Sequence, residues 1–295
     1  MIKIQLENIN RSKHGKLFVG NVEGFASVTS VAFLEDKIVT ASFVGMKLYL
    51  YKIHYDNDTY ELLDSIDTTF GGEIVSTNLL DYYNDLIVVS NFEQASQTIY
   101  KSVNDKLIFV KDVKSHYVKQ YCHGVKFNKY MDNILCATFY KNNLFEISFI
   151  DYINDKLLMS VKMEHGFNPK DVAFVSKNRL LVTCTTEGIK MQDIGEKQIT
   201  KIFLYKFDVN KKYFEILDMY TLNNSYSGCI QYNDNKIYVN NQLLGEINIY
   251  KLIDDKINNF ETIDEIGAPH GLAISKNNKL AICSYIDNAI YILKY

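Results

Sequence analysis

The amino-acid sequence predicts an all-β fold: a single six-bladed β-propeller of four-stranded antiparallel blades, with seven blades as the alternative. Three observations predict it. A strand pattern recurs every ~40 to 60 residues, aromatic residues that favour strands make up 13% of the chain, and no segment shows a sustained helical period. Because closed all-β architectures of this length form one unit, residues 1–295 are expected to be a single domain.

Each copy of the repeat opens with a short apolar strand, a polar turn and a second strand. The equivalent first-strand positions are taken as Val31, Val75, Val125, Val172, Ile230 and Leu272. In the second copy, residues 77–80 can be aligned in two ways, so the register of that copy is open. Six copies predict six blades.

A third strand of alternating character follows the second in each copy, as in residues 47–53 and 201–207. A fourth strand then follows in most copies, as in residues 60–67, 156–163 and 213–220. Alternation with period two is typical of a sheet whose faces differ in burial. Four antiparallel strands per copy correspond to one propeller blade.

The last copy ends after its third strand, which predicts that the other end of the chain supplies the fourth. Residues 3–23 align without gaps on residues 47–67. In that alignment the segment from Lys16 to Glu23 is the fourth strand, and its pairing with the C-terminal blade closes the ring and removes exposed sheet edges. The alignment gives the segment from Lys3 to Asn8 the third-strand role that residues 289–295 already fill. Two alternatives are open for it: it adds as an extra outer strand, or it displaces part of the C-terminal one.

Composition and charge exclude several classes of function. A net charge of −3, from 32 basic and 35 acidic residues, gives no basic excess for binding nucleic acid. No stretch is apolar for long enough to form a secretion signal or a membrane span, which predicts a soluble, cytoplasmic protein. The five cysteines are odd in number, and three lie in apolar strand-like runs, so reduced core thiols are expected.

The ends of several second strands resemble those of the YVTN and lactonase-like propeller superfamily. They are Val89-Ser90-Asn91-Phe92, Cys136-Ala137-Thr138-Phe139 and Cys283-Ser284-Tyr285, and the segment from Pro269 to Ser275 resembles the opening of that family's first strand. The resemblance implies the propeller fold, usually with seven blades, and basic side chains in the funnel for anionic substrates. The sequence has only Arg11 and Arg179, neither of them placed at the funnel, so an arginine anion clamp is not expected.

Candidate site residues come from the loops that enter the first strands, because in a propeller these loops surround one mouth of the channel. The six aligned positions are Thr29, Glu73, His123, Lys170, Ser227 and His270, with Asp171 beside Lys170. The alternative register of the second copy removes Glu73 from this set. With Glu73 and Asp171 as its only carboxylates, the mouth predicts no metal site, and no cofactor motif is present.

His123 and His270 open the third and sixth copies, which lie opposite each other in a ring of six. Each is interpreted first as a capping residue that hydrogen-bonds a neighbouring loop, and second as half of an acid and base pair or as an ion ligand. Opposite blades are expected to be too far apart for both histidines to bind one metal ion.

The leading functional hypothesis is a non-catalytic binding or scaffold propeller that holds a protein partner or a small polar ligand at the channel mouth. Thr29, Ser227, Asn91 and Tyr285 are its expected ligand-binding residues. The long segment from Thr186 to Thr200 is expected to project over the mouth, where loops of that length are often functional.

The alternative hypothesis is a lactonase-like hydrolase or lyase acting in the same funnel. In that case His123 and His270 supply the acid and base, and Lys170 stabilises the oxyanion. Glu73 or Asp171 then orients a histidine.

Overall fold

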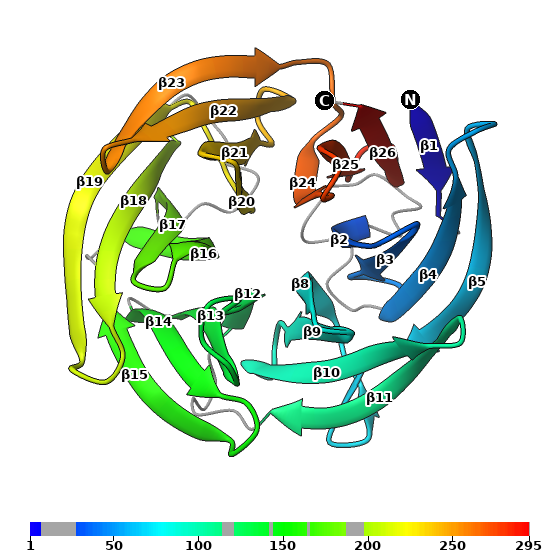
Figure 1. The fold of residues 1–295 in the computed structure, drawn as a ribbon, viewed down its shortest axis with the longest axis horizontal. Coiled ribbons are helices and arrows are strands. Elements are labelled where there is room, and N and C mark those ends of the chain that lie inside the picture. Colours follow the sequence, from blue (N-terminus) through cyan, green and yellow to red (C-terminus); the bar gives the residue numbers. More distant parts are fainter. Residues whose placement is uncertain (7–27, 114–120, 142–143, 164–165, 187–197, 295) are drawn as a thin grey trace.

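The described chain folds into a ring of six four-stranded sheets arranged around a common axis (Figure 1). The structure is a computed structural model that describes residues 1–6, 28–113, 121–141, 144–163, 166–186 and 198–294. Every regular element in these ranges is a β-strand. The six-bladed propeller predicted from the repeat is confirmed.

The first three blades follow one another along the chain, each running from its inner strand outward. The first blade is β2 (Val28–Leu34), β3 (Lys37–Ser42), β4 (Lys47–His54) and β5 (Thr59–Asp67). The second is β8 (Thr77–Tyr83), β9 (Leu86–Asn91), β10 (Ser96–Val103) and β11 (Lys106–Val113). The third is β12 (Tyr121–Phe127), β13 (Ile134–Lys141), β14 (Leu144–Asp151) and β15 (Lys156–Lys162).

The other three blades complete the ring. The fourth is β16 (Phe167–Ser176), β17 (Arg179–Thr186), β18 (Ile199–Asp208) and β19 (Tyr213–Asn223). The fifth is β20 (Ile230–Asn233), β21 (Lys236–Asn241), β22 (Glu246–Ile253) and β23 (Lys256–Ile263). The sixth is β24 (Pro269–Ile274), β25 (Lys279–Ser284), β26 (Ala289–Lys294) and β1 (Ile2–Gln5).

The ring is closed by β1, which pairs antiparallel with β26 from Ile2 opposite Ile292 to Gln5 opposite Ala289. The closing strand therefore comes from the N-terminus, as predicted, but it is a different segment. Residues 2–5 were aligned on a third strand, whereas they fill the outer, fourth position. The segment 16–23, predicted to occupy that position, lies outside the described residues.

The second blade resolves the open register of the repeat. Val88 pairs with Asp81 in this blade and Val39 pairs with Ala32 in the first, so Leu80 is the equivalent of Val31. Val75, aligned there from the sequence, lies before β8. The extra residues form a hairpin of β6 (Thr69–Phe70) and β7 (Glu73–Ile74), whose alternating pattern imitates a strand start.

Neighbouring blades share their apolar cores. One buried cluster combines Val39 and Leu50 of the first blade with Leu80 and Val89 of the second, and similar clusters join the third to the fourth blade and the sixth to the first. All five cysteines are buried thiols outside any disulfide, as expected. A helix able to cross a membrane is absent from the described part of the chain.

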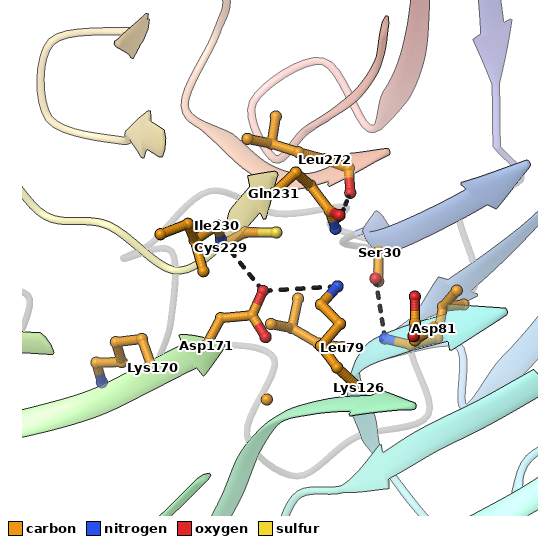
Figure 2. Close-up of polar contacts among 12 residues, drawn as sticks. Ser30, Leu79, Asp81, Lys126, Lys170, Asp171, Cys229, Ile230, Gln231 and Leu272 are labelled. Carbon is orange, nitrogen blue, oxygen red and sulfur yellow. Dashed lines mark hydrogen bonds and ion pairs between the residues drawn. The ribbon is translucent and has the colours of Figure 1, made fainter. Parts of the chain in front are cut away.

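Polar side chains of the inner strands join successive blades near the channel axis (Figure 2). Ser30 Oγ accepts a hydrogen bond from Leu80 N at 3.0 Å. Asp171 Oδ2 accepts one from Ile230 N at 3.2 Å, and Gln231 Nε2 donates to Leu272 O at 2.8 Å. These contacts satisfy backbone groups that the inner edge of each sheet leaves unpaired.

Candidate functional site at the channel mouth

A β-bulge near the start of the first strand shapes the mouth. Register shifts occur at this point in β2, β8, β12, β16 and β24. The bulged residues include Thr29, Asn78, His123, Lys170 and His270. A bulge turns a side chain out of the regular alternation of the strand, and here it does so at equivalent positions of five blades.

Both mouth histidines cap the neighbouring blade, as the first interpretation predicted. The Nδ1 atom of His123 lies 2.9 Å from Lys170 O, and that of His270 lies 2.7 Å from Thr29 O. A carbonyl oxygen can only accept, so each Nδ1 carries the proton. In the neutral imidazole each Nε2 is therefore left as a hydrogen-bond acceptor.

The expectation that the two histidines are far apart is wrong. Their ring centroids are 5.7 Å apart, although they belong to opposite blades. The glycine after each histidine allows close packing on the neighbouring blade, because a Cβ atom on Gly124 would lie 2.5 Å from Lys170 O, and one on Gly271 would also meet backbone at under 3.0 Å. The described residues nevertheless contain no group of three His, Cys, Asp or Glu side chains suited to a metal ion.

Burial changes the charge state of both imidazoles. It lowers the pKa of His270 to about 4, with the nearby Lys170 charge acting in the same direction. Burial, Lys170 and His270 together hold the pKa of His123 well below its ordinary value. Both rings are therefore neutral at pH 7, and neither is protonated there to act as the acid of the predicted acid and base pair.

Lys170 is a buried cation framed by aromatic rings. Its side chain belongs to a residue only 4% exposed, and its Nζ lies 4.6 Å from the ring centroid of Tyr140 and 5.3 Å from that of Tyr226. Among the described residues, no carboxylate lies within 4.0 Å of this ammonium. Aromatic faces stabilise a cation without neutralising it.

Tyrosines form the upper part of the mouth. The Tyr285 ring lies 4.5 Å from His270, and the Tyr140 ring lies 6.4 Å from His123, centroid to centroid. Burial, followed by the proximity of Tyr226, raises the pKa of both Tyr140 and Tyr285 well above the ordinary value. Both hydroxyls therefore stay protonated and available as donors.

Tyr285 was predicted from the sequence, whereas Tyr140 and Tyr226 were missed. The signal for Tyr140 is positional: it follows Phe139 at the end of the second strand, as Tyr285 follows Ser284 in the sixth copy. Tyr226 lies in the loop before β20, whose irregular sequence gives no comparable alignment.

Three predicted ligand-binding residues are engaged within the scaffold of the mouth. Thr29 Oγ1 donates to Ala41 O at 3.3 Å. Ser227 Oγ donates to the side chain of Asn240 at 3.1 Å. Asn91 Nδ2 donates to Ser96 and Thr98. These bonds fix the loops, and a direct ligand role for the three stays a prediction.

Among the described residues, neither predicted carboxylate is a hydrogen-bond partner of His123 or His270. Glu73 is exposed in the β6–β7 hairpin, and Asn78 takes its place in the ring. Asp171 is fully buried deeper in the channel, 3.7 Å from Lys126. Figure 2 shows it directed at Lys126 and Ile230 while Lys170 points elsewhere. Backbone carbonyls, rather than Glu73 or Asp171, orient the two imidazoles.

Asp171 and Lys126 form the layer beneath the mouth. Burial raises the pKa of Asp171 to about 6, against the opposing effect of the Lys126 charge. The predicted mouth loop from Thr186 to Thr200 lies largely outside the described residues. Its described ends are joined by a hydrogen bond between Thr186 Oγ1 and Gln198 Oε1 of 3.1 Å.

Comparison with known proteins supports the fold. No protein-family profile and no curated protein matches the chain. A Bacteroides uniformis protein provisionally named a 6-phosphogluconolactonase is 14% identical with a TM-score of 0.59, covering 94% of this chain and 83% of that one. The Cps50 (Swd1) β-propeller domain of Myceliophteria thermophila is 12% identical, with a TM-score of 0.58 and coverage of 91% and 82%.

A third similar structure is the C-terminal WD40 domain of Sif2, 10% identical with a TM-score of 0.53, covering 100% of this chain and 99% of that one. At these identities the likeness concerns the fold alone. The resemblance to lactonase-like propellers is thereby confirmed at the level of fold. Neighbours named as lactonases and neighbours of the WD40 type occur together, so the fold does not choose between catalysis and binding.

Proposed function

We propose that this propeller is a binding protein whose channel mouth holds a small hydroxy acid or its phosphate ester. The observation that carries the proposal is the Lys170 ammonium, buried in a residue 4% exposed and without a carboxylate within 4.0 Å among the described residues. A buried charge without a partner is costly. An anionic ligand group beside Lys170 removes that cost.

The two imidazoles supply the second part of the site. With each Nδ1 donating to a carbonyl, the Nε2 atoms of His123 and His270 accept hydrogen bonds. A carboxylate or phosphate alone gives them nothing to accept. A ligand hydroxyl next to the anionic group does, which is why a hydroxy acid fits better than a simple anion.

The low pKa values of the two imidazoles support binding over general acid catalysis. General acid catalysis at neutral pH needs a group protonated near pH 7, and the pKa of His270 is lowered to about 4. The protonated hydroxyls of Tyr140 and Tyr285 add donors to the ligand but are weak acids there. At neutral pH the mouth thus presents neutral imidazoles and protonated tyrosine hydroxyls to a ligand.

The proposal is tested by calorimetric titration of the intact chain with D-lactate, D-gluconate and their phosphate esters. Lys170→Met keeps the length of the side chain, removes its charge, and is expected to weaken binding about ten- to a hundredfold. Lys201→Met is the matched control, because Lys201 also lies over an aromatic ring, 4.0 Å from the Phe167 centroid. Equal affinity of both variants for the ligand would contradict the proposal.

A lactonase-like hydrolase is the second candidate, favoured by the 5.7 Å separation of the two imidazole rings beside Lys170. Two histidines this close can act on one substrate carbonyl, with the Lys170 ammonium beside the developing oxyanion. Glu73 is removed from this candidate by its exposed position, and Asp171 by its contact with Lys126.

The second candidate predicts turnover of a lactone or ester panel, and a loss of about 10² to 10⁴ in rate for His123→Ala and His270→Ala. If the protein only binds, each variant instead loses a capping bond and about 0.5 to 1.5 kcal/mol of stability. Melting curves and rates measured on the same samples separate the two. At neutral pH the two imidazoles can serve this candidate only as general bases for an attacking water. Hydrolysis that persists unchanged in both variants rules them out in that role.

A further inference from the structure

A cavity of about 250 Å³ lies at the end of the channel opposite the mouth. Its lining comes from the far ends of the first strands and from the turns that follow them in the third and fifth blades. Asp81, Lys126, Ala173 and Gln231, which line it, occupy equivalent positions of four first strands. The Lys126 and Asp171 pair separates this cavity from the mouth.

The floor of the cavity carries polar groups with unused capacity. Asp81 is 7% exposed, and its Oδ2 accepts from Phe127 N at 3.0 Å, its one hydrogen bond among the described residues. Lys126 is 5% exposed and has an ion pair with Asp171. Gln231 Nε2 donates to Leu272 O, so its Oε1 remains an acceptor. Acceptors and donors therefore alternate across the floor.

The lining of the cavity carries charges of both signs. It includes two carboxylates, Asp81 and Asp234, and two ammonium groups, Lys126 and Lys129, of which Lys126 is already paired with Asp171. A ligand with a net charge gains attraction from one pair and repulsion from the other. A neutral ligand with groups that both donate and accept hydrogen bonds uses all four.

Aromatic rings form the walls and are held in place at their tips. Tyr130 donates its hydroxyl to Val175 O at 2.9 Å, and Tyr232 donates to Asn235 Oδ1 at 2.9 Å. With the hydroxyls engaged, the rings present apolar surface to the cavity. Buried Phe127 and Phe174 extend that surface.

We propose that this cavity is a second binding site, for a neutral polyhydroxy compound of monosaccharide size. Hydroxyl groups donate to Asp81 and Gln231 and accept from Lys126, while the C–H face of the ligand packs on Tyr130 and Tyr232. The volume of about 250 Å³ is below that of sites for drug-sized molecules and suits a single sugar ring. The site is independent of the mouth and of its proposed ligand.

The test is saturation-transfer NMR and calorimetric titration of the intact chain with D-glucose, D-galactose, D-mannose and myo-inositol. L-Arginine and inorganic phosphate serve as the charged comparison. At least one neutral compound is expected to bind with a Kd at or below ~10 mM. Asp81→Asn, which keeps an acceptor for Phe127 N, is expected to weaken that binding about ten- to a hundredfold.

Asp218→Asn is the matched control, because Asp218 also accepts a backbone N–H, from Ile257 at 2.8 Å, and pairs with a lysine, but it lies on β19 away from the cavity. Tyr130→Ala provides a variant at a residue 49% exposed, in case Asp81→Asn does not fold, and is also expected to weaken sugar binding. Binding of arginine or phosphate in place of the neutral compounds overturns the ligand class. No binding, or sugar binding unchanged in the two cavity variants, overturns the site.

Discussion

The two ends of the channel differ in how their charges are compensated. At the mouth, Lys170 lies among aromatic rings and neutral imidazoles, with no carboxylate within 4.0 Å in the described chain. At the opposite end the lining holds carboxylates and ammonium groups together, and Lys126 is paired with Asp171. Lys170 and Asp171 are adjacent in one strand and serve different levels of the channel. Substitution at one of two neighbouring positions of the repeat can therefore alter the charge at one end of the channel without altering it at the other.

Removal of the Asp171 carboxylate, which lies between the two ends of the channel, is expected to cause the largest loss of stability. Asp171→Ala leaves Lys126 buried without its ion-pair partner and Ile230 N without an acceptor. The loss of stability expected from denaturant titration is about 3 to 5 kcal/mol. The double variant Lys126→Met with Asp171→Ala is expected to recover part of it, because no uncompensated charge remains.

Asp64→Ala is the control for that experiment. Asp64 has the same two partners, a backbone N–H from Leu107 at 2.8 Å and a lysine, Lys106, at 3.2 Å, but Lys106 is 65% exposed. Its removal is expected to cost about 1 kcal/mol. If both variants lose equal stability, burial of the dividing pair is not what makes it important.

The second largest loss of stability is expected from a methyl group added at Gly124, where the backbone of the third blade closely approaches that of the fourth. A methyl group at Gly124 meets Lys170 O at 2.5 Å and Asp171 Oδ1 at 2.7 Å. Gly124→Ala is therefore expected to destabilise the fold by about 3 kcal/mol, and to weaken mouth ligands more than cavity ligands. Gly71→Ala meets no atom within 4 Å at a φ of +60°, and is expected to cost only about 1 kcal/mol. Similar losses for the two would show that packing between the blades tolerates the methyl group.

Acid sensitivity distinguishes the mouth from the dividing layer. The folded pKa of His270, about 4, is below its unfolded value, so its contribution to stability is present above pH 6.5 and is lost as the pH falls toward 4. His123 acts in the same direction. The raised pKa of Asp171, about 6, acts oppositely, because the folded state then holds a proton that the unfolded chain has released.

The two histidines together outweigh the one aspartate, so stability is expected to fall on acidification from pH 6.5 to 4. His270→Gln is expected to reduce that slope by about 1.4 kcal/mol per pH unit, and Asp171→Asn to steepen it. Urea midpoints measured across this pH range check both signs. An unchanged slope in His270→Gln would mean that the imidazole is as easily protonated in the fold as in the unfolded chain.

The smallest loss of stability is expected from weakening the ion pair between Arg179 and Asp255. Arg179 Nε and Nη2 both donate to the carboxylate of Asp255, at distances between 2.9 and 3.2 Å, which joins the fourth blade to the fifth. Arg179→Lys loses the two-pronged geometry and is expected to cost up to about 1 kcal/mol. A thermal melt at two salt concentrations checks it, since a partly exposed pair weakens with salt.

The number of blades and most strand positions could be predicted because each copy of the repeat shows the same short alternation of apolar and polar residues. The exceptions arose where a local pattern occurs twice. Val75 and Leu80 both open an apolar run, and only pairing with β9 distinguishes them. Residues 2–5 and 16–23 both alternate like strands, and the sequence alone does not show which of them pairs with β26.

The residues of the mouth could be predicted by position but not by contact. Alignment placed His123, Lys170 and His270 at equivalent positions, in the loops that enter the first strands. They lie within β12, β16 and β24 instead, at the bulge near the start of each strand. The 5.7 Å approach of the two histidines depends on how closely six blades converge, which Gly124 and Gly271 permit but a sequence does not measure. Tyr226 belongs to an irregular loop that aligns with no other copy of the repeat, so its position over Lys170 is evident only from the structure.

The pairing of β1 with β26 has a consequence for the order of folding. Ile2 and Ile292 are partners across a sheet, so the sixth blade cannot be completed until β26 has been synthesised. Until then β1 has no partner strand at its edge. Contacts of such sequence separation form slowly, and a newly made chain is most exposed to misassociation in the interval before β1 meets β26.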